Sequence, residues 1–381
     1  MPVYLDCNAT TPVGDEVLEA MLPYLRAGFG NPSSAHSFGR MAREAVENAR
    51  SQIASALGCA SSQVIFTSCG SEANNHFIKG LAGYVKPSQV AVSAIEHPSV
   101  SKSAESLARS GWTVRKIRVD EKGVVDMHDA EAAMSAPTGM LSVMLANNET
   151  GVVQNIGMLS EMARSRKIWM HTDAVQAFGK IPFDFPSLGV HAMTISSHKI
   201  YGPKGAGALI LDKRLSLNPL IDGGGQESGL RSGTENVAAI VGFGVAAMLA
   251  RTRQEHFASS MAKMKLHLEE ALRGMGAVFF SDAARTLPNT AYFSFPGIEG
   301  GTLVSEMDRM GFAIASGSAC SSGKTEPSGT LLAMGVSPEL ARGAVRVSLG
   351  LENTDAHIAG FLEAMHRTLD RLSSMASRIQ V

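Results

Sequence analysis

Apolar positions along the chain follow two spacings, and together they predict helices that alternate with short buried strands. Between residues 37 and 57 apolar side chains recur every three or four positions, the spacing of one helix face, and Gly58 can end that helix. Short continuous apolar runs are typical of strands that helices cover on both faces. Such runs lie at 64–66, 90–95, 141–146, 168–172, 192–195 and 207–211. The alternation predicts an α/β fold with a mostly parallel sheet.

The last third of the chain is organised differently. A long helical pattern at about 236–273 separates it from the part that precedes it. Beyond this helix we expect strands at 278–280, 290–295 and 345–349, and helices at 302–310 and from 354 onward. This order predicts a second, smaller α+β domain.

Composition narrows the classes of protein to which the chain could belong. The 381 residues include 34 Lys and Arg against 35 Asp and Glu, so the net charge is −1 and nothing favours direct binding to nucleic acid or to an anionic membrane. No apolar run of about 18 residues predicts a membrane span, and no secretory signal precedes the first strand. The four cysteines show neither CxxC pairs nor metal-ligand spacing, which indicates a reducing compartment and no metal site. We therefore expect a soluble, cytoplasmic protein.

Polar side chains follow five of the expected strands. In parallel sheets ligands bind beyond the carboxyl ends of the strands, so residues at these positions are candidates for an active site. The five strand ends lead into the segments 67–72, 96–97, 147–149, 173–176 and 196–199. Because the ends of parallel strands meet at one edge, their polar residues are expected to surround one site.

Three residues in these segments carry specific chemistry. Ser71, after Gly70, can direct backbone N–H groups and a hydroxyl at a phosphate, although an ordinary helix N-cap would look the same. Asp173 ends an apolar strand, and a buried carboxylate there needs a cationic or hydrogen-bonding partner. Lys199 also follows an apolar strand and is a candidate Schiff-base amine, with a surface loop lysine as the alternative.

Cys320 lies in an unusual setting. The segment 315–323 contains small, polar and flexible residues around this one cysteine, without the apolar neighbours of a structural thiol. An accessible thiol is therefore expected, although reactivity also requires a stabilised thiolate. The glycine-rich segment 202–207 fits neither a P-loop nor a dinucleotide fingerprint, which argues against a nicotinamide oxidoreductase.

Several motifs together resemble those of the cysteine desulfurases, which are class V aminotransferase-fold enzymes that use pyridoxal phosphate (PLP). The segment 197–205, Ser-His-Lys-Ile-Tyr-Gly-Pro-Lys-Gly, resembles the cofactor-lysine signature of that fold. Further matching segments are 4–6, 8–11, 30–36, 96–97, 147–151 and 231–234. The cysteine loop, which ends in Glu326-Pro327-Ser328, resembles the branch that serves nitrogen fixation and iron–sulfur assembly. The resemblance extends in order from residue 3 to about 350.

This resemblance implies a fold and a set of cofactor contacts. The fold would be PLP-dependent transferase fold type I, with a mostly parallel seven-stranded sheet. Its large domain would span residues 14–254, and residues 1–13 with 255–381 would form the small domain that carries a mobile cysteine loop at about 316–329. Lys199 would bind PLP covalently and later move the Cα proton of the substrate, while Asp173 would pair with the pyridinium nitrogen so that the ring acts as an electron sink. The remaining cofactor contacts would be Gln176 at the ring hydroxyl, His97 stacked on the ring and serving as an acid–base group, and Gly70, Ser71, Ser196 and His198 at the phosphate.

The same resemblance implies the reaction and its partners. L-cysteine would be held by Arg346, whose bidentate fork suits a carboxylate, with help from Asn148. Cys320 would attack the substrate sulfur and form a persulfide, with L-alanine as the other product. Thr234 would reach the phosphate of a neighbouring subunit, so a homodimer is expected. The sulfur would pass to an acceptor protein: an iron–sulfur scaffold, a partner in RNA thiolation or a partner in DNA sulfur modification.

Other functions share parts of this pattern. A selenocysteine lyase or an aminotransferase would need Lys199, Asp173 and His97 but not Cys320. A silent docking protein for sulfur transfer would keep the fold without the chemistry. Cys7 and Cys69, which lie beside polar motifs, are either additional redox-sensitive thiols or, as we favour, small packing residues.

Overall fold

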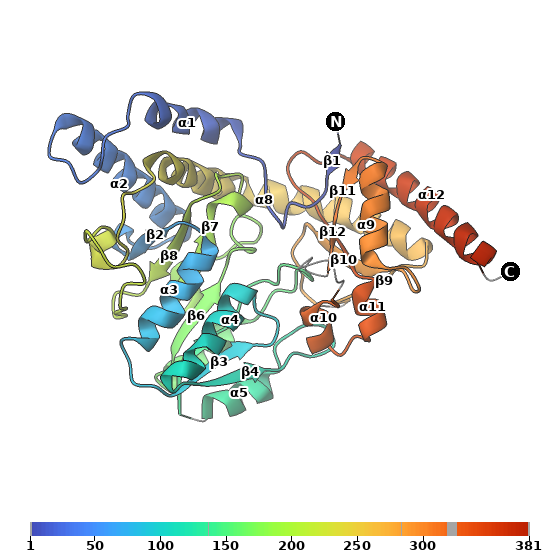
Figure 1. Ribbon diagram of the computed structural model, residues 1–381, viewed down its shortest axis with the longest axis horizontal. Coiled ribbons are helices and arrows are strands. Elements are labelled where there is room, and N and C mark those ends of the chain that lie inside the picture. The colour runs from blue at the N-terminus through green and yellow to red at the C-terminus, as the bar shows by residue number, and fades with distance from the viewer. Residues whose placement is uncertain (1, 136, 283, 318–325, 380–381) are drawn as a thin grey trace.

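Two sheets of different construction organise the molecule (Figure 1). The computed structural model describes residues 2–135, 137–282, 284–317 and 326–379. Seven strands form the larger sheet and four form the smaller one, with a separate pair of short strands beside the latter. The expected α/β fold with a seven-stranded, mostly parallel sheet is confirmed.

The larger sheet places the ends of its strands at one edge. In the order β2-β8-β7-β6-β5-β3-β4, only β8 runs against its neighbours. The strands are β2 (Val64–Thr67), β3 (Gln89–Ser93), β4 (Thr113–Ile117), β5 (Thr138–Ser142), β6 (Trp169–Asp173), β7 (Ala192–Ser196) and β8 (Gly207–Leu211). All five strands from which polar site residues were predicted therefore point their carboxyl ends in one direction.

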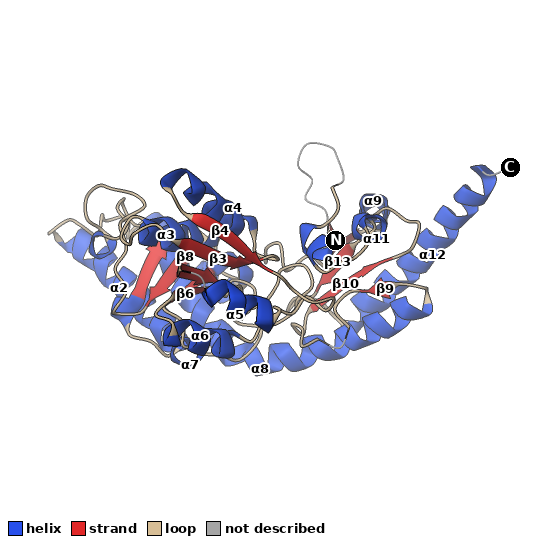
Figure 2. Ribbon diagram, turned by 90° about the horizontal axis from the view of Figure 1, so that it is seen from below, coloured by secondary structure: helices blue, strands red, loops and turns tan. Residues whose placement is uncertain are grey.

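Helices cover both faces of this sheet (Figure 2). On one face, α3 (Gly70–Ala82) and α4 (Pro98–Ser106) bury Phe77 and Val100 against the strands. The opposite core contains residues of α1 (Asp15–Arg26), α2 (Ser37–Leu57), α5 (Met127–Ser135), α6 (Ile156–Ser165), α7 (Phe185–Leu188) and α8 (Val237–Gly274). Burial on both faces explains why these strands are apolar along their whole length.

The smaller sheet is antiparallel, in the order β12-β13-β10-β9. Its strands are β9 (Val278–Phe279), β10 (Thr290–Ser294), β12 (Ala315–Ser316) and β13 (Val345–Ser348). The helices of this part are α9 (Gly300–Arg309), α10 (Gly329–Ala333), α11 (Pro338–Arg342) and α12 (Asp355–Ile379). The chain begins here as well, because β1 (Val3–Tyr4) pairs with β11 (Phe312–Ala313) and Leu5 belongs to this core. The register places Arg346 directly between Tyr292 and Ala315.

Helix α8 connects the two parts (Figure 2). Its first half packs Phe243 and Ala247 into the core of the larger sheet, and its second half packs Phe257 and Leu268 into the core of the smaller one. One continuous helix thus contributes to two cores. Within the described residues, no helix combines the length and apolar character that crossing a membrane requires.

The larger sheet differs from the sequence-based prediction in three places. The strand expected at 141–146 is β5 and ends at Ser142, although Val143 and Leu145 still donate backbone hydrogen bonds to the chain of β6. Strand β4 was not predicted, because its outward residues are charged or exposed. Strand β8 was expected but runs antiparallel, since an apolar run does not reveal the direction of a strand.

Candidate active site

A cavity of about 270 Å³ lies where the strands of the larger sheet end. It brings together most of the residues predicted for the site. Those that line it are Gly70, Ser71, His97, Asn148, Asp173, Gln176, Ser196, His198, Lys199 and Arg346. Thr234 does not line this cavity and is exposed, and Cys320 falls outside the described residues. Nine of the ten gathered residues come from the strands of the larger sheet, from the segments that follow them or from the start of α3, and Arg346 comes from β13.

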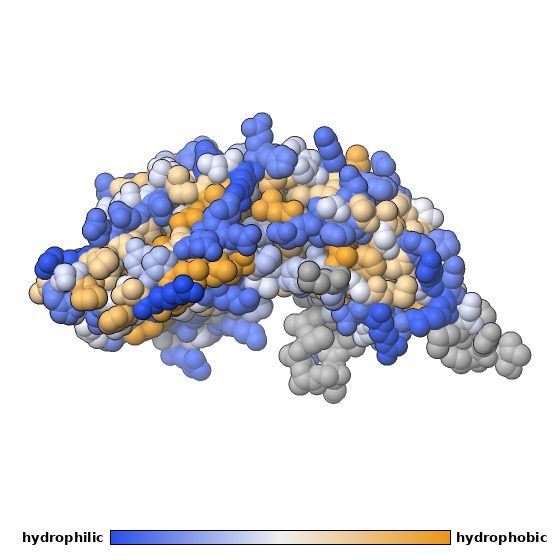
Figure 3. Space-filling model, turned by 90° about the horizontal axis from the view of Figure 1, so that it is seen from above, coloured by the Kyte–Doolittle hydropathy of each residue, from blue (hydrophilic) through white to orange (hydrophobic). Residues whose placement is uncertain are grey.

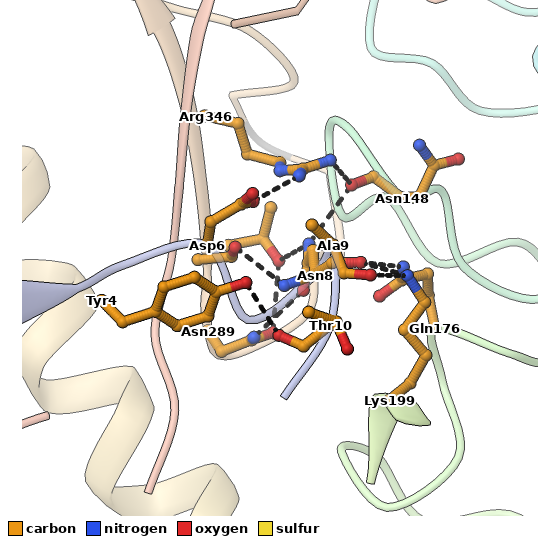
Figure 4. Close-up of polar contacts among 12 residues, drawn as sticks. Tyr4, Asp6, Asn8, Ala9, Thr10, Asn148, Gln176, Lys199, Asn289 and Arg346 are labelled. Carbon is orange, nitrogen blue, oxygen red and sulfur yellow. Dashed lines mark hydrogen bonds and ion pairs between the residues drawn. The ribbon is translucent and has the colours of Figure 1, made fainter. Parts of the chain in front are cut away.

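Lys199 ends the 3₁₀ turn that follows β7 (Ser197–Lys199). Its Nζ donates to the backbone carbonyls of Asn8 at 2.6 Å and Ala9 at 2.7 Å (Figure 4). Burial lowers the pKa of Lys199 to about 8, and the charge of Arg346 acts in the same direction. The neutral amine, which is the nucleophilic form, is therefore accessible near physiological pH.

Asp173 is held at both carboxylate oxygens. Its Oδ1 accepts from the backbone N–H of Val175 at 2.9 Å, and its Oδ2 accepts from Nδ2 of Asn74 at 2.7 Å. Asn74 is a buried residue of α3 that the sequence did not single out. These two donors fix the orientation of a buried carboxyl group that lines the cavity.

His97 is oriented by Ser99. Nδ1 of His97 accepts from the backbone N–H of Ser99 at 3.1 Å and lies 2.7 Å from the Ser99 hydroxyl. Because Nδ1 acts as an acceptor, the ring proton resides on Nε2. Burial lowers the pKa of His97, with Lys199 acting in the same direction and Asp173 opposing, so the ring is neutral at pH 7.

The hydroxyl of Ser99 also accepts from Asn74 Nδ2 at 2.9 Å. One chain of contacts therefore joins His97, Ser99, Asn74 and Asp173. Asn74 and Ser99 were not predicted from the sequence. Their positions beside predicted residues, one in the first turns of α3 and one just after His97, were the signal that could have identified them.

The donors at the start of α3 are arranged for an anion. At Gly70 a Cβ atom would lie 2.9 Å from Cγ2 of Val175, so the close approach here requires glycine. The hydroxyl of Ser196 is buried without a hydrogen-bond partner. Burial and the charges of Lys199 and Lys204 lower the pKa of His198 to about 4, which leaves a neutral ring. An unpartnered hydroxyl and a helix N-terminus match the needs of a phosphate.

The cavity therefore fits PLP in the chemistry of its donors. Four kinds of group line the same space: an amine, an oriented carboxyl group, a neutral imidazole and a set of donors suited to a phosphate. PLP needs these four kinds of group for its aldehyde, ring nitrogen, ring face and phosphate, respectively.

Arg346 faces this cavity from the smaller sheet. Its NH2 donates to Asp6 Oδ1 at 2.6 Å and its NH1 donates to the backbone carbonyl of Asn148 at 2.9 Å (Figure 4). Each terminal nitrogen carries two hydrogens, so one N–H on each is left. These two N–H groups remain available to a substrate carboxylate, the group that arginine binds best. Asp6, which holds the guanidinium, was quoted in a motif but received no predicted role.

Asn8 connects the residues behind Lys199. Its backbone carbonyl also accepts from Gln176 Nε2 at 2.9 Å, and its Oδ1 accepts from Asn289 Nδ2 at 3.2 Å (Figure 4). The same Oδ1 accepts from Lys180 Nζ at 2.7 Å. Lys180 donates to Gln176 Oε1 at 2.8 Å as well, and burial lowers its pKa to about 7. Nothing in the sequence distinguished Lys180, because its buried position depends on the N-terminal segment that covers it.

Cys7 is buried, and burial raises its pKa to about 12. It borders a second cavity of about 400 Å³ that reaches Lys199 and is lined mainly by residues of the N-terminal segment, α8 and the end of β13. A thiol with this pKa forms little thiolate, so packing rather than reactivity explains Cys7. Cys69 is half-buried and lines the active-site cavity.

Comparison with known proteins gives consistent matches over almost the whole chain. The model of the aminotransferase class-V family matches residues 3–361. The cysteine desulfurase IscS of Dictyoglomus turgidum is 41% identical over 378 residues, covering 98% of this chain and 96% of that protein. The cysteine desulfurase NifS of Azotobacter vinelandii is 40% identical over 360 residues, covering 93% and 90%. A solved structure of a NifS-like protein superposes with a TM-score of 0.92 at 37% identity, covering 97% of this chain and all of that one.

Proposed function

The chain belongs to the class V aminotransferase family and is a PLP-dependent cysteine desulfurase of the NifS/IscS branch, and from this premise we propose which residues perform each part of the reaction. When bound, PLP supplies an electron sink for the electron pair left at the substrate Cα. Lys199 would bind the cofactor, Asp173 would pair with its ring nitrogen and His97 would lie against the ring. Gln176 would contact the ring hydroxyl. The phosphate would be held by Gly70, Ser71, Ser196 and His198.

Lys199 and His97 have different capacities for moving protons. The pKa of Lys199, about 8, places its amine between the free base and the ammonium form at neutral pH, so it is suited to take the Cα proton and return it. His97 carries its proton on Nε2 and is neutral, so it acts first as a hydrogen-bond donor. We therefore assign the Cα proton transfer to Lys199.

Arg346 and Asn148 would orient the substrate. The two remaining N–H groups of Arg346 would bind the carboxylate of L-cysteine, and Asn148, whose backbone already holds the guanidinium, would add its side-chain amide. Both residues meet Lys199 around one cavity although they come from different sheets. This convergence is the single observation that carries the proposal.

Cys320 would receive the sulfur. Its thiolate attacks the substrate sulfur, an S–S bond forms and the Cβ–S bond breaks. The electron pair of the broken bond stays with the substrate carbon, which takes up a proton and becomes L-alanine. The thiol is oxidised to a persulfide while the carbon is reduced, so the step needs no external oxidant.

The test replaces Cys320 with alanine in the holoenzyme. We expect Cys320→Ala to keep the yellow colour of bound PLP, to form no protein persulfide and to release little alanine from L-cysteine. Cys59→Ala is the matched control, since burial raises the pKa of the Cys59 thiol to about 11 and it lies outside the site. Undiminished alanine formation by Cys320→Ala would contradict the proposed role and favour a lyase reaction at the same cavity.

We also propose a homodimer in which Thr234 reaches the site of the neighbouring subunit. Large apolar side chains are exposed on and between α1 and α2, and apolar residues interrupt the polar surface over this half of the molecule (Figure 3). They are Leu18, Leu25, Phe29, Phe38 and Met41, and Phe29 is 75% exposed. Exposed apolar patches of this kind mark association surfaces. Thr234 is exposed as well, as this arrangement requires.

The remaining assignments concern organisation and setting. We propose a large domain at 14–254 and a small domain of 1–13 with 255–381, a division that the packing of Leu5 with Phe257 and Phe361 in one core supports. The persulfide sulfur would pass to an acceptor protein, with iron–sulfur scaffolds and RNA- or DNA-modifying partners as candidate classes. The scarcity of cysteine favours a reducing, cytoplasmic setting.

A further inference from the structure

The carboxylate of Glu149 connects the active-site loop of the larger sheet to three hydroxyl groups of the smaller part. Its Oε2 accepts from Tyr292 Oη at 3.0 Å and from Ser328 Oγ at 2.5 Å, and its Oε1 accepts from Thr330 Oγ1 at 2.9 Å. The three hydroxyl donors and the carboxylate form a small hydrogen-bond network, in which loss of one group weakens the contacts of the others. None of the roles assigned above uses Glu149.

The loop that presents Glu149 is held in place independently of these contacts. Asn147 Oδ1 accepts from the backbone N–H groups of Glu149 and Thr150, each at 2.9 Å, and Asn147 Nδ2 donates to the carbonyl of Ile95 at 3.0 Å. The neighbouring Asn148 carbonyl is held by Arg346. Glu149 therefore extends from a fixed turn that also carries a proposed substrate contact.

Two of the three hydroxyl partners lie just after the segment that contains Cys320. Ser328 is the N-cap of α10, where its hydroxyl also accepts from the backbone N–H of Leu331 at 3.2 Å. Thr330 is in the first turn of the same helix and is buried. Glu149 thus holds the start of α10.

The third partner, Tyr292, lies against the chain just before that segment. A Cβ atom added to Gly317 would be 1.8 Å from Tyr292 Oη, so the ring packs directly on the backbone of Gly317. The N–H of Gly317 also donates to the carbonyl of Ala344 at 2.9 Å, beyond the β12–β13 pairing. In the same sheet Tyr292 is the direct cross-strand neighbour of Arg346.

From these contacts we propose that Glu149 is a positioning residue for sulfur transfer: through Ser328, Thr330 and Tyr292 it holds the chain on both sides of the Cys320 segment in register with Asn148 and Arg346. The inference rests on the proposed role of Cys320 as the sulfur acceptor. Its physical basis is that a nucleophile and its target must be placed within a fraction of an ångström, so small displacements cost large factors in rate.

The expected consequence is a slower chemical step with unchanged substrate binding. Glu149 has no hydrogen bond to Lys199, Asp173 or the Arg346 side chain, and Asn147 keeps the loop in place without it. Loss of the carboxylate should therefore release Ser328, Thr330 and Tyr292 while leaving the cofactor and substrate contacts intact.

The experiment compares Glu149→Gln, Tyr292→Phe and the double variant in the holoenzyme. Single-turnover persulfide formation on Cys320 is followed by mass spectrometry, and cysteine binding is followed by the absorbance change of bound PLP. We expect Glu149→Gln to slow persulfide formation about 10- to 100-fold, with cysteine binding changed less than about threefold. The double variant should be slowed less than the product of the single effects, because both changes break the same contact.

The controls separate this inference from the proposed function and from a loss of stability. Glu269→Gln makes the same change at a partly buried glutamate in the second half of α8 and should leave persulfide formation unchanged. Normal persulfide formation in Glu149→Gln, or an equal loss of cysteine binding, would overturn the positioning role. If Cys320→Ala still releases sulfur, the proposed function fails. If Cys320→Ala is inactive while Glu149→Gln behaves as the parent enzyme, only the present inference fails.

Discussion

The site residues of the larger sheet lie at the ends of its strands, whereas the smaller sheet contributes Arg346 from the middle of a strand. Asp173 and Ser196 end parallel strands and Lys199 follows one, and because the carboxyl ends of these strands share an edge, their meeting requires only that the sheet forms. Arg346 instead lies in an antiparallel ladder between Tyr292 and Ala315.

This difference determines how sensitive each half of the site is to a change of register. In the antiparallel sheet a shift of one residue would turn Arg346 to the opposite face and remove it from the cavity. In the parallel sheet the loop residues would still lie at the same edge. The smaller sheet therefore needs additional contacts, and the ion pair of Arg346 with Asp6 and the hydrogen bonds of Glu149 supply them.

Of the substitutions considered for the two sheets, replacement of Asp173 in the larger sheet should cause the greatest loss of activity. Asp173→Asn keeps the size of the side chain but loses the negative charge, and its amide group conflicts with the Asn74 donor. We expect kcat/KM for alanine formation to fall about 100-fold, in line with the loss of a charged hydrogen bond of ~3 kcal/mol. PLP colour should persist, since Lys199 is intact.

Steady-state kinetics and absorbance spectra at equal protein concentration measure this effect. Asp308→Asn, at an exposed position of α9, serves as the matched control and should behave as the parent enzyme. Retention of full activity by Asp173→Asn would mean that the larger sheet does not supply the charge that the reaction needs.

A substitution at Arg346 in the smaller sheet should mainly weaken the binding of the substrate. Arg346→Lys retains the positive charge but lacks the fork that contacts Asp6 and Asn148 and leaves two N–H groups for the substrate. We expect KM for L-cysteine to rise about 30-fold, corresponding to ~2 kcal/mol, with a smaller change in kcat. Arg342→Lys, in the exposed part of α11, is the control. A fall in kcat at constant KM would show that Arg346 acts on the chemical step instead.

A substitution at Glu96 should change the stability of the fold and have little effect on activity, because Glu96 lies behind the site. Its Oε1 accepts from Ser93 Oγ and from the backbone N–H of Met144 at 2.7 Å, and burial raises its pKa to about 8. The group's contribution to stability is complete below its unfolded pKa near 4.5 and is lost as the pH rises toward 8, because the carboxyl ionises in the unfolded chain while the folded protein keeps it protonated. Glu96→Gln mimics the protonated form at every pH.

We therefore expect Glu96→Gln to gain stability relative to the parent protein between pH 5 and pH 8, by roughly 1–3 kcal/mol. Denaturant unfolding at a series of pH values measures this difference. Glu299→Gln, at an exposed position before α9, should show no such trend. A constant difference across the pH range would mean that Glu96 is ionised in the folded protein.

Much of the fold was predictable because it depends on local patterns. The helix at 37–57 has the predicted bounds, and the long helix α8 differs from its predicted range by one residue at each end. The direction of β8 and the existence of β4 were not predictable. Both depend on neighbours in the sheet rather than on the residues of the strand itself.

Within the site, the residues with distinctive chemistry were identified and the residues that orient them were not. Lys199, Asp173 and His97 follow apolar strands, and that position drew attention to them. Asn74 and Lys180 are buried polar residues whose partners are 99 and 172 positions away in the chain. No local pattern marks such contacts, since they form only when distant segments pack together.

By itself the sequence determined which chemical groups the site contains and which ends of the strands carry them, because side-chain identity and strand periodicity are local properties. Only the tertiary structure decided how those groups behave. The pKa of about 8 at Lys199 and about 7 at Lys180, and the neutral tautomer of His97, arise from burial and from partners on other segments. Desolvation and hydrogen-bond geometry come into existence only when the chain has folded.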